Sequence, residues 1–593
     1  MHRTRLPAIL VTATLLLAAL APSALAKPGP GSPAEDNANT TEVQILALND
    51  FHGALPPPSG SGGRIGSLTD VDPGPGENLQ CLAPTCYLAG GVGYLAAHVE
   101  QLRATNPNSL FVSAGDLIGA TPLVSALFHD EPTIEAFNLM GLDYNGVGNH
   151  EFDEGVDELL RMQHGGCHPE DGCLDGDPFH GAEFEFLAAN VKYKDTGETI
   201  FPPYAIHKFD GIKIGIVGMT LEGTPTIVTP AGIQTVDFFD EAESVNALVP
   251  HLRRQGVETI IVLLHEGGTI GAPGNGAGSV AAINSCNNPS GPLPPIVAAM
   301  DDAIDVVVTG HTNWAVNCVI DGKVVTGAAS AGRLVTDIDL TISRATKDVI
   351  KSETRVNNVI VTRDVVPEQA LLDLVAKYSA LSAPLENRVV GSITTTLSRT
   401  QNAAGESPLG DVIADAQLAA TSDPLFGGAV VALMNPGGIR GDITYDSPAG
   451  TGGQVTYGEL FNVQPFNNVM TVMTCSGATI DTLLEQQFDN PTAGERRMLQ
   501  VSNGFTYAWS ASAPLGSKVD PASIQINGVP IDPAGSYRVA MNNFLATGGD
   551  NFRAFLDCTD PLGGEIDLDV LVTYFGANSP VAPGPQNRIT MIP

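Results

Sequence analysis

A series of short apolar runs in the first half of the chain each end in side chains that can bind cations. These side chains are Asp50 and His52 after VQILAL, Asp116 after SLFVSA, Asn149 after DYNGV, His265 after TIIVLL, and His311 and Asn313 after DVVVT. Carboxylate, imidazole and amide groups are all ligands for divalent cations, and a pair of cations needs about seven or eight of them, with one carboxylate bridging. The set contains no Cys, which favours Zn²⁺, Mn²⁺ or Fe.

The elements around these side chains would bring them together. Plausible helices lie between several of the runs, for example over residues 93–105 and 239–255. This alternation predicts an α/β domain with buried strands. In such sheets, ligands bind beyond the carboxyl ends of the strands, which is where the polar groups recur. Asp50 and His52 are two residues apart, so both can face one cation in extended backbone. An ordinary strand-end turn is the alternative interpretation of this pair.

One similar motif points elsewhere but is incomplete. His265 and Glu266 begin HEGGT, which resembles the start of the zinc-protease motif HExxH. The second histidine of that motif is missing, which argues against a protease of that class.

A chain of 593 residues is too long for one typical core, and we expect two or more domains. We predict a metal-binding domain over 42–345, a linker with a connector helix over 346–385, and a second α/β domain over 386–593. The connector helix is expected to end near Pro384.

The N-terminus reads as a secretory signal peptide over residues 1–26. Arg3 and Arg5 precede an apolar stretch, and Ala24-Leu25-Ala26 fits the small-x-small cleavage pattern. Residues 27–41 are expected to form a disordered leader. The apolar stretch is too short to span a bilayer comfortably, and no sorting motif or hydrophobic tail follows residue 566. We therefore expect a secreted protein without a membrane span, and leave a periplasmic or cell-surface location open.

The charge of the chain limits its partners. The formal net charge of −36 argues against a broad surface for nucleic-acid polymers, although a local cluster of cations can still bind a small phosphorylated substrate.

An even number of cysteines in an exported chain suggests disulfides. The close pairs are Cys81–Cys86 and Cys167–Cys173, and Cys286–Cys318 and Cys475–Cys558 would follow by elimination from about 105 connectivities.

The motifs resemble a known family. The first half resembles calcineurin-like metallophosphoesterases through NDFHG, GD at 115–116, GNHEFD, the strand-end His265 and GHTN. The second half resembles the 5′-nucleotidase C-terminal domain through NPGGIRGD, FNVQPFNN and NNFLATGGDNF. Secreted 5′-nucleotidases combine both. The resemblance implies an N-terminal four-layer αββα sandwich holding two divalent metal ions and a second α/β domain that binds substrate.

The resemblance also implies roles for single residues. Asp50, His52, Asp116 and Asn313 would hold one metal, and Asp116, Asn149, His265 and His311 the other. His150 and Asp153 would form a catalytic dyad beside the metals, with a metal-bound water or hydroxide attacking phosphorus. A buried structural role is the alternative for His150.

In the second domain, the resemblance implies a nucleotide pocket. Its residues would be Asn435 and Arg440 on the base or phosphate side, Phe466 and Phe544 around the base, and Asp550 at the ribose. Family members often carry an arginine where this chain has Gly405, and Arg399 would supply the missing positive charge. Without the resemblance, the two phenylalanines would be core residues and Asp550 a turn residue.

The expected function is hydrolysis of nucleoside 5′-phosphates, with a small nucleotide as the binding partner. UDP-sugar hydrolysis and 2′,3′-cyclic nucleotide phosphodiesterase activity are the alternatives within the same chemistry. A non-catalytic binding or adhesive module is the alternative from another class. The sequence leaves the preferred base, the native metals and the oligomeric state open.

Overall fold

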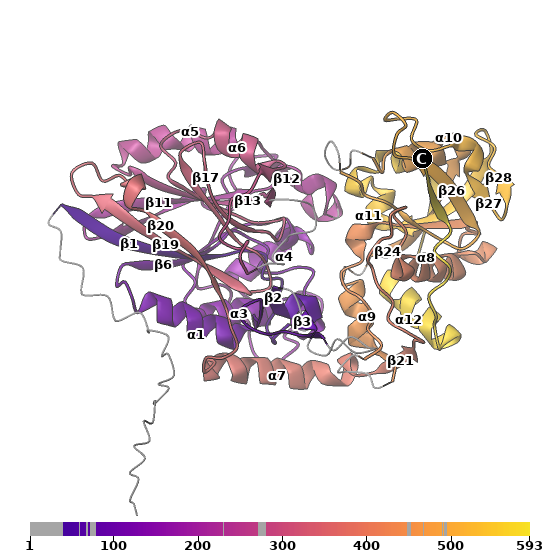
Figure 1. Cartoon of the computed structure of the whole chain (residues 1–593), viewed down its shortest axis with the longest axis horizontal. Coiled ribbons are helices and arrows are strands. Elements are labelled where there is room, and N and C mark those ends of the chain that lie inside the picture. The colour runs from indigo at the N-terminus through magenta and orange to yellow at the C-terminus, as the bar shows by residue number, and fades with distance from the viewer. Residues whose placement is uncertain are drawn as a thin grey trace, which may run out of the picture.

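The computed structural model describes residues 39–58, 60–66, 69–70, 79–228, 230–270, 280–446, 452–466, 468–488, 490 and 495–593. The predicted signal peptide and most of the predicted leader lie outside these residues. The chain forms two lobes that lie side by side (Figure 1). Across the described residues, none of the helices combines the length and apolar character needed to cross a bilayer.

The N-terminal lobe contains two six-stranded mixed sheets. The first has the order β20 (Arg355–Ile360), β19 (Leu334–Ser343), β1 (Thr40–Leu48), β6 (Ser109–Ser113), β7 (Tyr144–Gly146) and β8 (Glu185–Leu187). The second has the order β10 (Tyr204–Phe209), β11 (Ile212–Thr220), β13 (Thr259–His265), β16 (Val306–Thr309), β18 (Lys323–Ala328) and β17 (Ala315–Ile320).

The two sheets pack face to face because their strands are apolar on both sides. Along β1, Val43 and Ile45 point into a core shared with Ile214 and Ile261 of the second sheet. Leu46, next to them, points to the opposite face, as strand periodicity requires. The outer faces are covered by helices α1 (Val92–Arg103), α3 (Glu131–Met140) and α4 (Val156–His164) on one side, and α5 (Glu241–Arg254) and α6 (Leu293–Ala299) on the other. The predicted four-layer αββα sandwich is confirmed.

Two predicted boundaries differ from the structure. β1 begins at Thr40, so this strand includes the end of the predicted leader. The predicted linker starts at residue 346, yet β20 pairs antiparallel with β19 and extends the first sheet. The sandwich therefore continues to Ile360, because the exposed edge of β19 offers backbone hydrogen bonds that β20 satisfies. The connector helix α7 (Gln369–Glu386) follows and packs against helices of both lobes (Figure 1).

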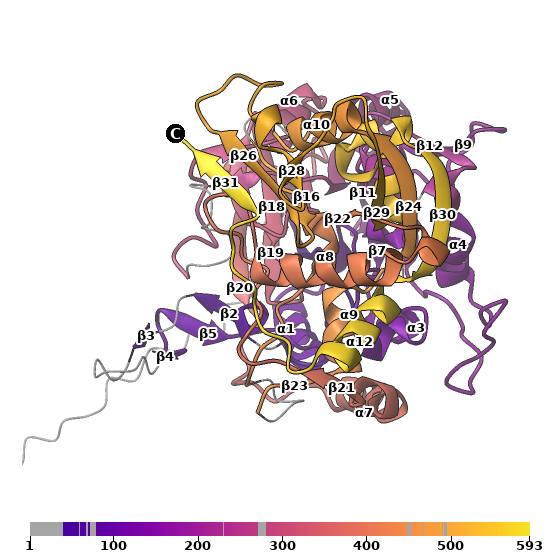
Figure 2. The same ribbon diagram turned by 90° about the vertical axis from the view of Figure 1, so that its right-hand side faces the viewer.

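The C-terminal domain is built on a five-stranded sheet with cores on both faces. Its order is β25 (Gln500–Val501), β22 (Val431–Met434), β29 (Ser536–Asn542), β24 (Val469–Ser476) and β30 (Thr559–Ile566). Helices α8 (Pro408–Thr421), α9 (Tyr457–Val463) and α12 (Asp567–Asn578) cover one face, and Figure 2 shows α8 beside the central strands. The other face packs against α10 (Gly477–Glu485) and a four-stranded sheet of β28 (Val529–Pro530), β27 (Gln525–Ile526), β26 (Phe505–Ser510) and β31 (Ile589–Ile592).

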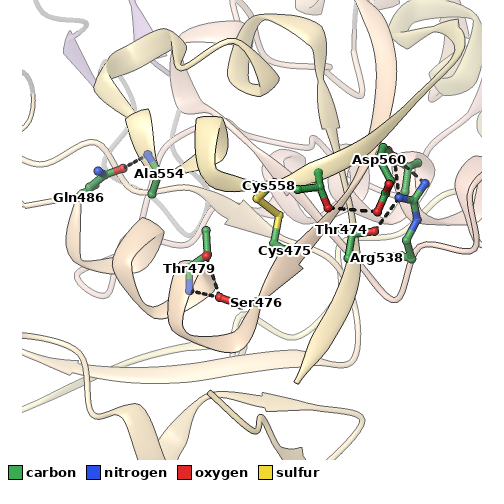
Figure 3. The surroundings of a disulfide bond; sticks show 11 residues. Thr474, Cys475, Ser476, Thr479, Gln486, Arg538, Ala554, Cys558 and Asp560 are labelled. Atoms are coloured by element: carbon green, nitrogen blue, oxygen red, sulfur yellow. Dashed lines mark hydrogen bonds between the residues drawn. A yellow bond between two sulfur atoms is a disulfide. The ribbon is translucent and has the colours of Figure 1, made fainter. Parts of the chain in front are cut away.

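The disulfide pairs suggested by the spacing and parity of the cysteines are all present. They are Cys81–Cys86, Cys167–Cys173, Cys286–Cys318 and Cys475–Cys558. The last joins the end of β24 to the start of β30 (Figure 3). Because these strands pair with each other, the cross-link ties two neighbours in the sheet whose cysteines are 83 residues apart in the chain.

Candidate active site

The predicted metal ligands of the N-terminal domain converge where strands of both sheets end. β1, β6 and β7 run parallel in the first sheet, and β13 and β16 run parallel in the second. Asp50 follows β1, Asp116 follows β6, and His265 is the last residue of β13. These carboxyl ends meet at one edge of the sandwich, which is the usual place for a site in such sheets.

Asp116 lies at the centre of this cluster. Its Oδ2 atom is 3.0 Å from Nε2 of His265 and 3.8 Å from Nε2 of His52. Asn149 places its Oδ1 atom 3.1 Å from Nε2 of His265 and 2.9 Å from Nδ1 of His311. A carboxylate between histidines from two sheets is the arrangement expected of a ligand that bridges two cations.

Two of the histidines are oriented by backbone carbonyls. Nδ1 of His52 lies 2.9 Å from the carbonyl oxygen of Gly119, and Nδ1 of His265 lies 2.7 Å from that of Ala114. When each Nδ1 carries the proton, it donates to the carbonyl and leaves the Nε2 lone pair facing Asp116. Support of this kind is typical of metal-binding histidines.

The donor set fits divalent cations. Asp50 is fully buried, and among the described residues its Oδ1 atom has no hydrogen-bond partner. Burial lowers the pKa of His52 and of His311 to about 3, so both imidazoles are neutral and keep a lone pair for a cation. A buried oxygen without a donor is costly unless an ion satisfies it.

The backbone at the site adopts rare conformations. φ is 50° at Asp50, 47° at His52, 54° at Asp116, 67° at His311 and 60° at Asn313. Side-chain-bearing residues seldom occupy this left-handed region, and strain of this kind is concentrated at functional sites. Asn313 is exposed and its amide donates to the backbone oxygen of His311 at 3.2 Å.

The predicted dyad lies beside the cluster. Nδ1 of His150 is 2.8 Å from Oδ2 of Asp153, and the backbone N–H of His150 donates to Oδ1 of Asp116 at 2.9 Å. Burial opposes charge on His150, but the carboxylates of Asp153 and Asp116 outweigh it and raise its pKa. His150 is therefore suited to carry a proton or a positive charge next to the cations.

A cavity of about 490 Å³ joins the dyad to the C-terminal domain. Its wall includes Asn149, His150, Asp153 and His311 from the first domain, and Asn435, Arg440, Phe466, Phe544 and Asp550 from the second. The structure thus brings five of the six predicted substrate residues to one cavity. Arg399 is absent from the described lining. Its guanidinium donates to the backbone oxygen of Ile439 at 3.0 Å, and its charge adds to burial in lowering the pKa of Arg440.

Within the cavity, the predicted pocket residues contact one another across the domains. The ring of Phe466 stacks on His150 with centroids 5.9 Å apart, and the guanidinium of Arg440 lies 5.7 Å from the Phe466 centroid. Asn435 donates to Oδ2 of Asp550 at 2.7 Å. The predicted base-binding side of the cavity therefore borders directly on the dyad.

Comparisons with known proteins agree with this geometry. Residues 43–314 match the family model described as calcineurin-like phosphoesterase, and residues 389–557 match that of the 5′-nucleotidase C-terminal domain. A cell wall protein of Listeria monocytogenes is 30% identical over 597 residues, which cover 95% of this chain and 70% of that protein. The chain belongs to this family of calcineurin-like phosphoesterases with a 5′-nucleotidase C-terminal domain.

Two further relatives extend the comparison. The endonuclease YhcR of Bacillus subtilis is 31% identical over 552 residues, which are 93% of this chain but only 41% of that relative's length. The structure of a 5′-nucleotidase precursor from Thermus thermophilus is 25% identical, with a TM-score of 0.71 over 93% of this chain and 99% of that one. Proteins of the calcineurin-like phosphoesterase family use divalent metals to cleave phosphoesters, and this chain is accordingly a phosphoester hydrolase.

Sequence reasoning missed one supporting residue in the phosphoesterase domain. The buried carboxylate of Glu151 accepts hydrogen bonds from the backbone N–H groups of Asp116, Leu117 and Gly148 at 2.8–2.9 Å. It thereby holds the turn that presents Asp116. The only signal in the sequence is its position inside GNHEFD.

A second missed residue lies in the 5′-nucleotidase C-terminal domain. Arg497 lines the cavity, and one of its Nη atoms forms a close ion pair with Oδ1 of Asp550. Asp550 is thus held by Arg497 on one oxygen and by Asn435 on the other. GERRM has no feature that separates this arginine from an exposed one.

Proposed function

We propose that this phosphoesterase hydrolyses nucleoside 5′-monophosphates to nucleoside and phosphate at a site with two divalent metal ions. The observation that carries the proposal is one continuous cavity. It joins the Asp116-centred cluster to two aromatic rings, Phe466 and Phe544, in the other domain. A phosphate at the cluster and a base between the rings would both fall within this cavity.

The roles of the protein groups follow from their positions. Asp50, His52, Asp116 and Asn313 would hold one cation, and Asp116, Asn149, His265 and His311 the other. When bound, the two cations supply Lewis-acid activation of the phosphoryl group and lower the pKa of water. The set combines carboxylate and amide oxygens with three imidazoles and contains no thiolate, so Zn²⁺, Mn²⁺ and Fe are the candidate metals.

His150 would stabilise the charge that develops during the reaction. Its imidazole, oriented by Asp153, faces the cavity and the cluster. A protonated imidazole there stabilises phosphoryl oxygens or the leaving oxygen as negative charge builds up. Arg440 supplies a second positive charge near the dyad. It lies close enough to His52 and His150 that its charge disfavours protonation of both imidazoles.

The C-terminal domain would select the nucleoside. Base–aromatic stacking contributes on the order of 1–3 kcal/mol and tolerates different bases. Asp550 offers a carboxylate to ribose hydroxyl groups. UDP-sugars and 2′,3′-cyclic nucleotides are the alternative small substrates. A polynucleotide is the alternative suggested by the endonuclease relative, and the net charge of −36 argues against it.

We further propose that the protein is exported by the signal peptide over residues 1–26, and that substrate binding uses the domain beyond α7. The connector helix α7 packs against both lobes, and a rotation of the domains about it would open the cavity for substrate to enter and product to leave.

Product analysis tests the function directly: free phosphate is measured for the nucleoside monophosphates, UMP for UDP-glucose, an adenosine monophosphate for 2′,3′-cyclic AMP, and shortened strands for DNA. Purified protein is assayed with AMP, other nucleoside monophosphates, UDP-glucose, 2′,3′-cyclic AMP and DNA, with added Zn²⁺, Mn²⁺ or Mg²⁺. We expect the highest kcat/KM for a nucleoside monophosphate, and loss of activity after prolonged chelation that the metals reverse. Cleavage of DNA in preference to monophosphates would overturn the proposed substrate. Full activity after complete metal removal would overturn the mechanism.

A further inference from the structure

A second cluster of metal-binding side chains lies on the rim of the same cavity. His129 follows the short helix α2 (Leu123–Ala126), and Glu154 directly follows Asp153 of the dyad. Both line the cavity. His168 and Asp171 come from a loop that the Cys167–Cys173 disulfide closes. Three separate segments therefore meet at one point.

The ligand atoms of this rim cluster are close together. Nδ1 of His129 is 2.9 Å from Oε2 of Glu154, and its Nε2 is 2.9 Å from Oδ2 of Asp171. One ligand atom each of His129, Glu154 and His168 lies within 4.8 Å of the others. The two imidazole rings are stacked with centroids 3.8 Å apart, and one ring would have to turn for both to bind the same ion, because a cation lies in the plane of the imidazole that binds it.

The arrangement contains side chains that can bind a cation and a carboxylate that can orient one of them. A histidine that binds a cation through one ring nitrogen usually donates its other N–H to a carboxylate. His129 has that geometry, with Glu154 beside one nitrogen and Asp171 beside the other. His168 supplies a second imidazole, whose Nδ1 lies 3.5 Å from Oδ2 of Asp171 and accepts a 3.2 Å hydrogen bond from that residue's backbone N–H.

Charge balance also favours a dication. With a protonated His129, the carboxylates of Glu154 and Asp171 leave these three groups with a net charge of −1. The carboxylate of Glu158 also favours the charge on His129, and it is itself ion-paired with Arg161. A dication that replaces the His129 proton brings the cluster to neutrality. Two imidazoles with carboxylate oxygens form a donor set typical of Zn²⁺.

We propose that His129, Glu154 and His168 bind a third divalent transition-metal ion, such as Zn²⁺, with Asp171 as the hydrogen-bond acceptor that orients His129. This rim site is separate from the predicted pair of cations at Asp116, and it does not depend on the proposed substrate. A bound ion would cross-link the loop after α2, the segment after the dyad and the disulfide loop. It would thereby fix Glu154, next to Asp153, in the wall of the cavity.

Counting bound zinc tests the rim site. The full chain is stripped with a chelator, dialysed against a low concentration of Zn²⁺, and its zinc content is measured by mass spectrometry. We expect His129→Gln and His168→Gln to bind one zinc ion per chain fewer than the unmodified protein. His180→Gln, which changes an exposed histidine outside the cluster, is the matched control and should lose none.

A second measurement separates zinc loss from misfolding. Near-ultraviolet circular dichroism of each variant should match the unmodified protein, and His168→Gln carries the test if His129→Gln does not fold. The same loss of one ion should occur in an Asp116→Asn background, where the predicted catalytic pair is already impaired. Equal zinc content in the unmodified protein and in His168→Gln would overturn the rim site, and so would a loss shared by His180→Gln.

Discussion

Asp116 and His265 belong to different sheets of the sandwich, yet their Oδ2 and Nε2 atoms are 3.0 Å apart. The contact places the candidate site on the seam between the sheets. Asp116 follows β6 of the first sheet, and His265 ends β13 of the second. The packing between the sheets therefore decides the geometry of the site. Because Asp116 lies in a turn after β6 and not inside the sheet, a change at this residue should affect the chemistry more than the folding.

We predict that Asp116→Asn lowers kcat/KM for AMP by about 100-fold or more. A neutral amide bridges two cations poorly, and loss of roughly 3 kcal/mol of transition-state stabilisation corresponds to that factor. Phosphate release measures the effect. Asp195→Asn, an exposed position, is the control with the same chemical change and should keep full activity. Unchanged turnover in Asp116→Asn would contradict the central role of this carboxylate.

His150→Ala should lower kcat by roughly 10²–10⁴-fold, the usual contribution of a positioned proton donor or acceptor. Asp153→Asn should cost less, because it removes only the group that orients His150 through the 2.8 Å hydrogen bond. Steady-state kinetics of both variants, together with their metal content, checks this. Metal content should stay at the level of the unmodified protein. A loss of bound metal in His150→Ala would mean that this histidine is a ligand and not part of a dyad.

Glu151→Gln should destabilise the protein by about 2 kcal/mol. The carboxylate accepts hydrogen bonds from three backbone N–H groups, and the glutamine amide would turn a donor toward at least one of them. Urea denaturation of the unmodified protein and the variant measures the difference. Glu198→Gln is the control with the same chemical change, since Glu198 is exposed and lies outside the site. Equal unfolding midpoints for all three proteins would refute the supporting role.

Phe466→Ala and Phe544→Ala should each raise KM for AMP by roughly ten-fold, since stacking on one base contributes on the order of 1–3 kcal/mol. Ribose 5-phosphate has no base and serves as the control substrate. Its KM should change little in either variant. If the KM for AMP and the KM for ribose 5-phosphate rise equally, the two rings pack the cavity wall and do not bind a base.

Asp305→Asn should stabilise the protein more at pH 8 than at pH 5. Asp305 is almost fully buried between β13 and β16, accepts a 3.1 Å hydrogen bond from the Ile260 backbone, and burial raises its pKa to about 7. The unfolded chain releases this proton near pH 4. The folded carboxyl group therefore contributes stability at low pH that is lost as the pH rises to about 7.

An asparagine at this position does not titrate, so the gain of the variant should grow by on the order of 2 kcal/mol between pH 5 and 8. Urea denaturation at the two pH values measures the change. A difference between variant and unmodified protein that stays constant with pH would show that Asp305 titrates normally.

Much of the fold follows from local pattern. The runs VQILAL and TIIVLL mark buried strands because they are continuously apolar, and the polar residues after them mark the carboxyl ends. Glu151 could not be predicted in the same way, because a glutamate has the same appearance in sequence whether it faces water or three backbone amides. Arg497 could not be predicted either, because an arginine looks the same in sequence whether it is exposed or paired with Asp550. The place of β20 in the first sheet could not be predicted because it depends on the free edge of β19.

By itself, the sequence indicated the α/β class, the two-domain order, the two close disulfide pairs and the residue types available for metal binding. These depend on hydrophobic periodicity, cysteine spacing and motifs, which are local properties of the chain. The tertiary structure decided the contacts that no motif indicated: Glu151 with the turn at Asp116, His150 with Phe466, and His129 with His168. The physical reason is that these contacts arise from sheets, loops and domains packing together over long sequence separations, and no local pattern specifies that packing.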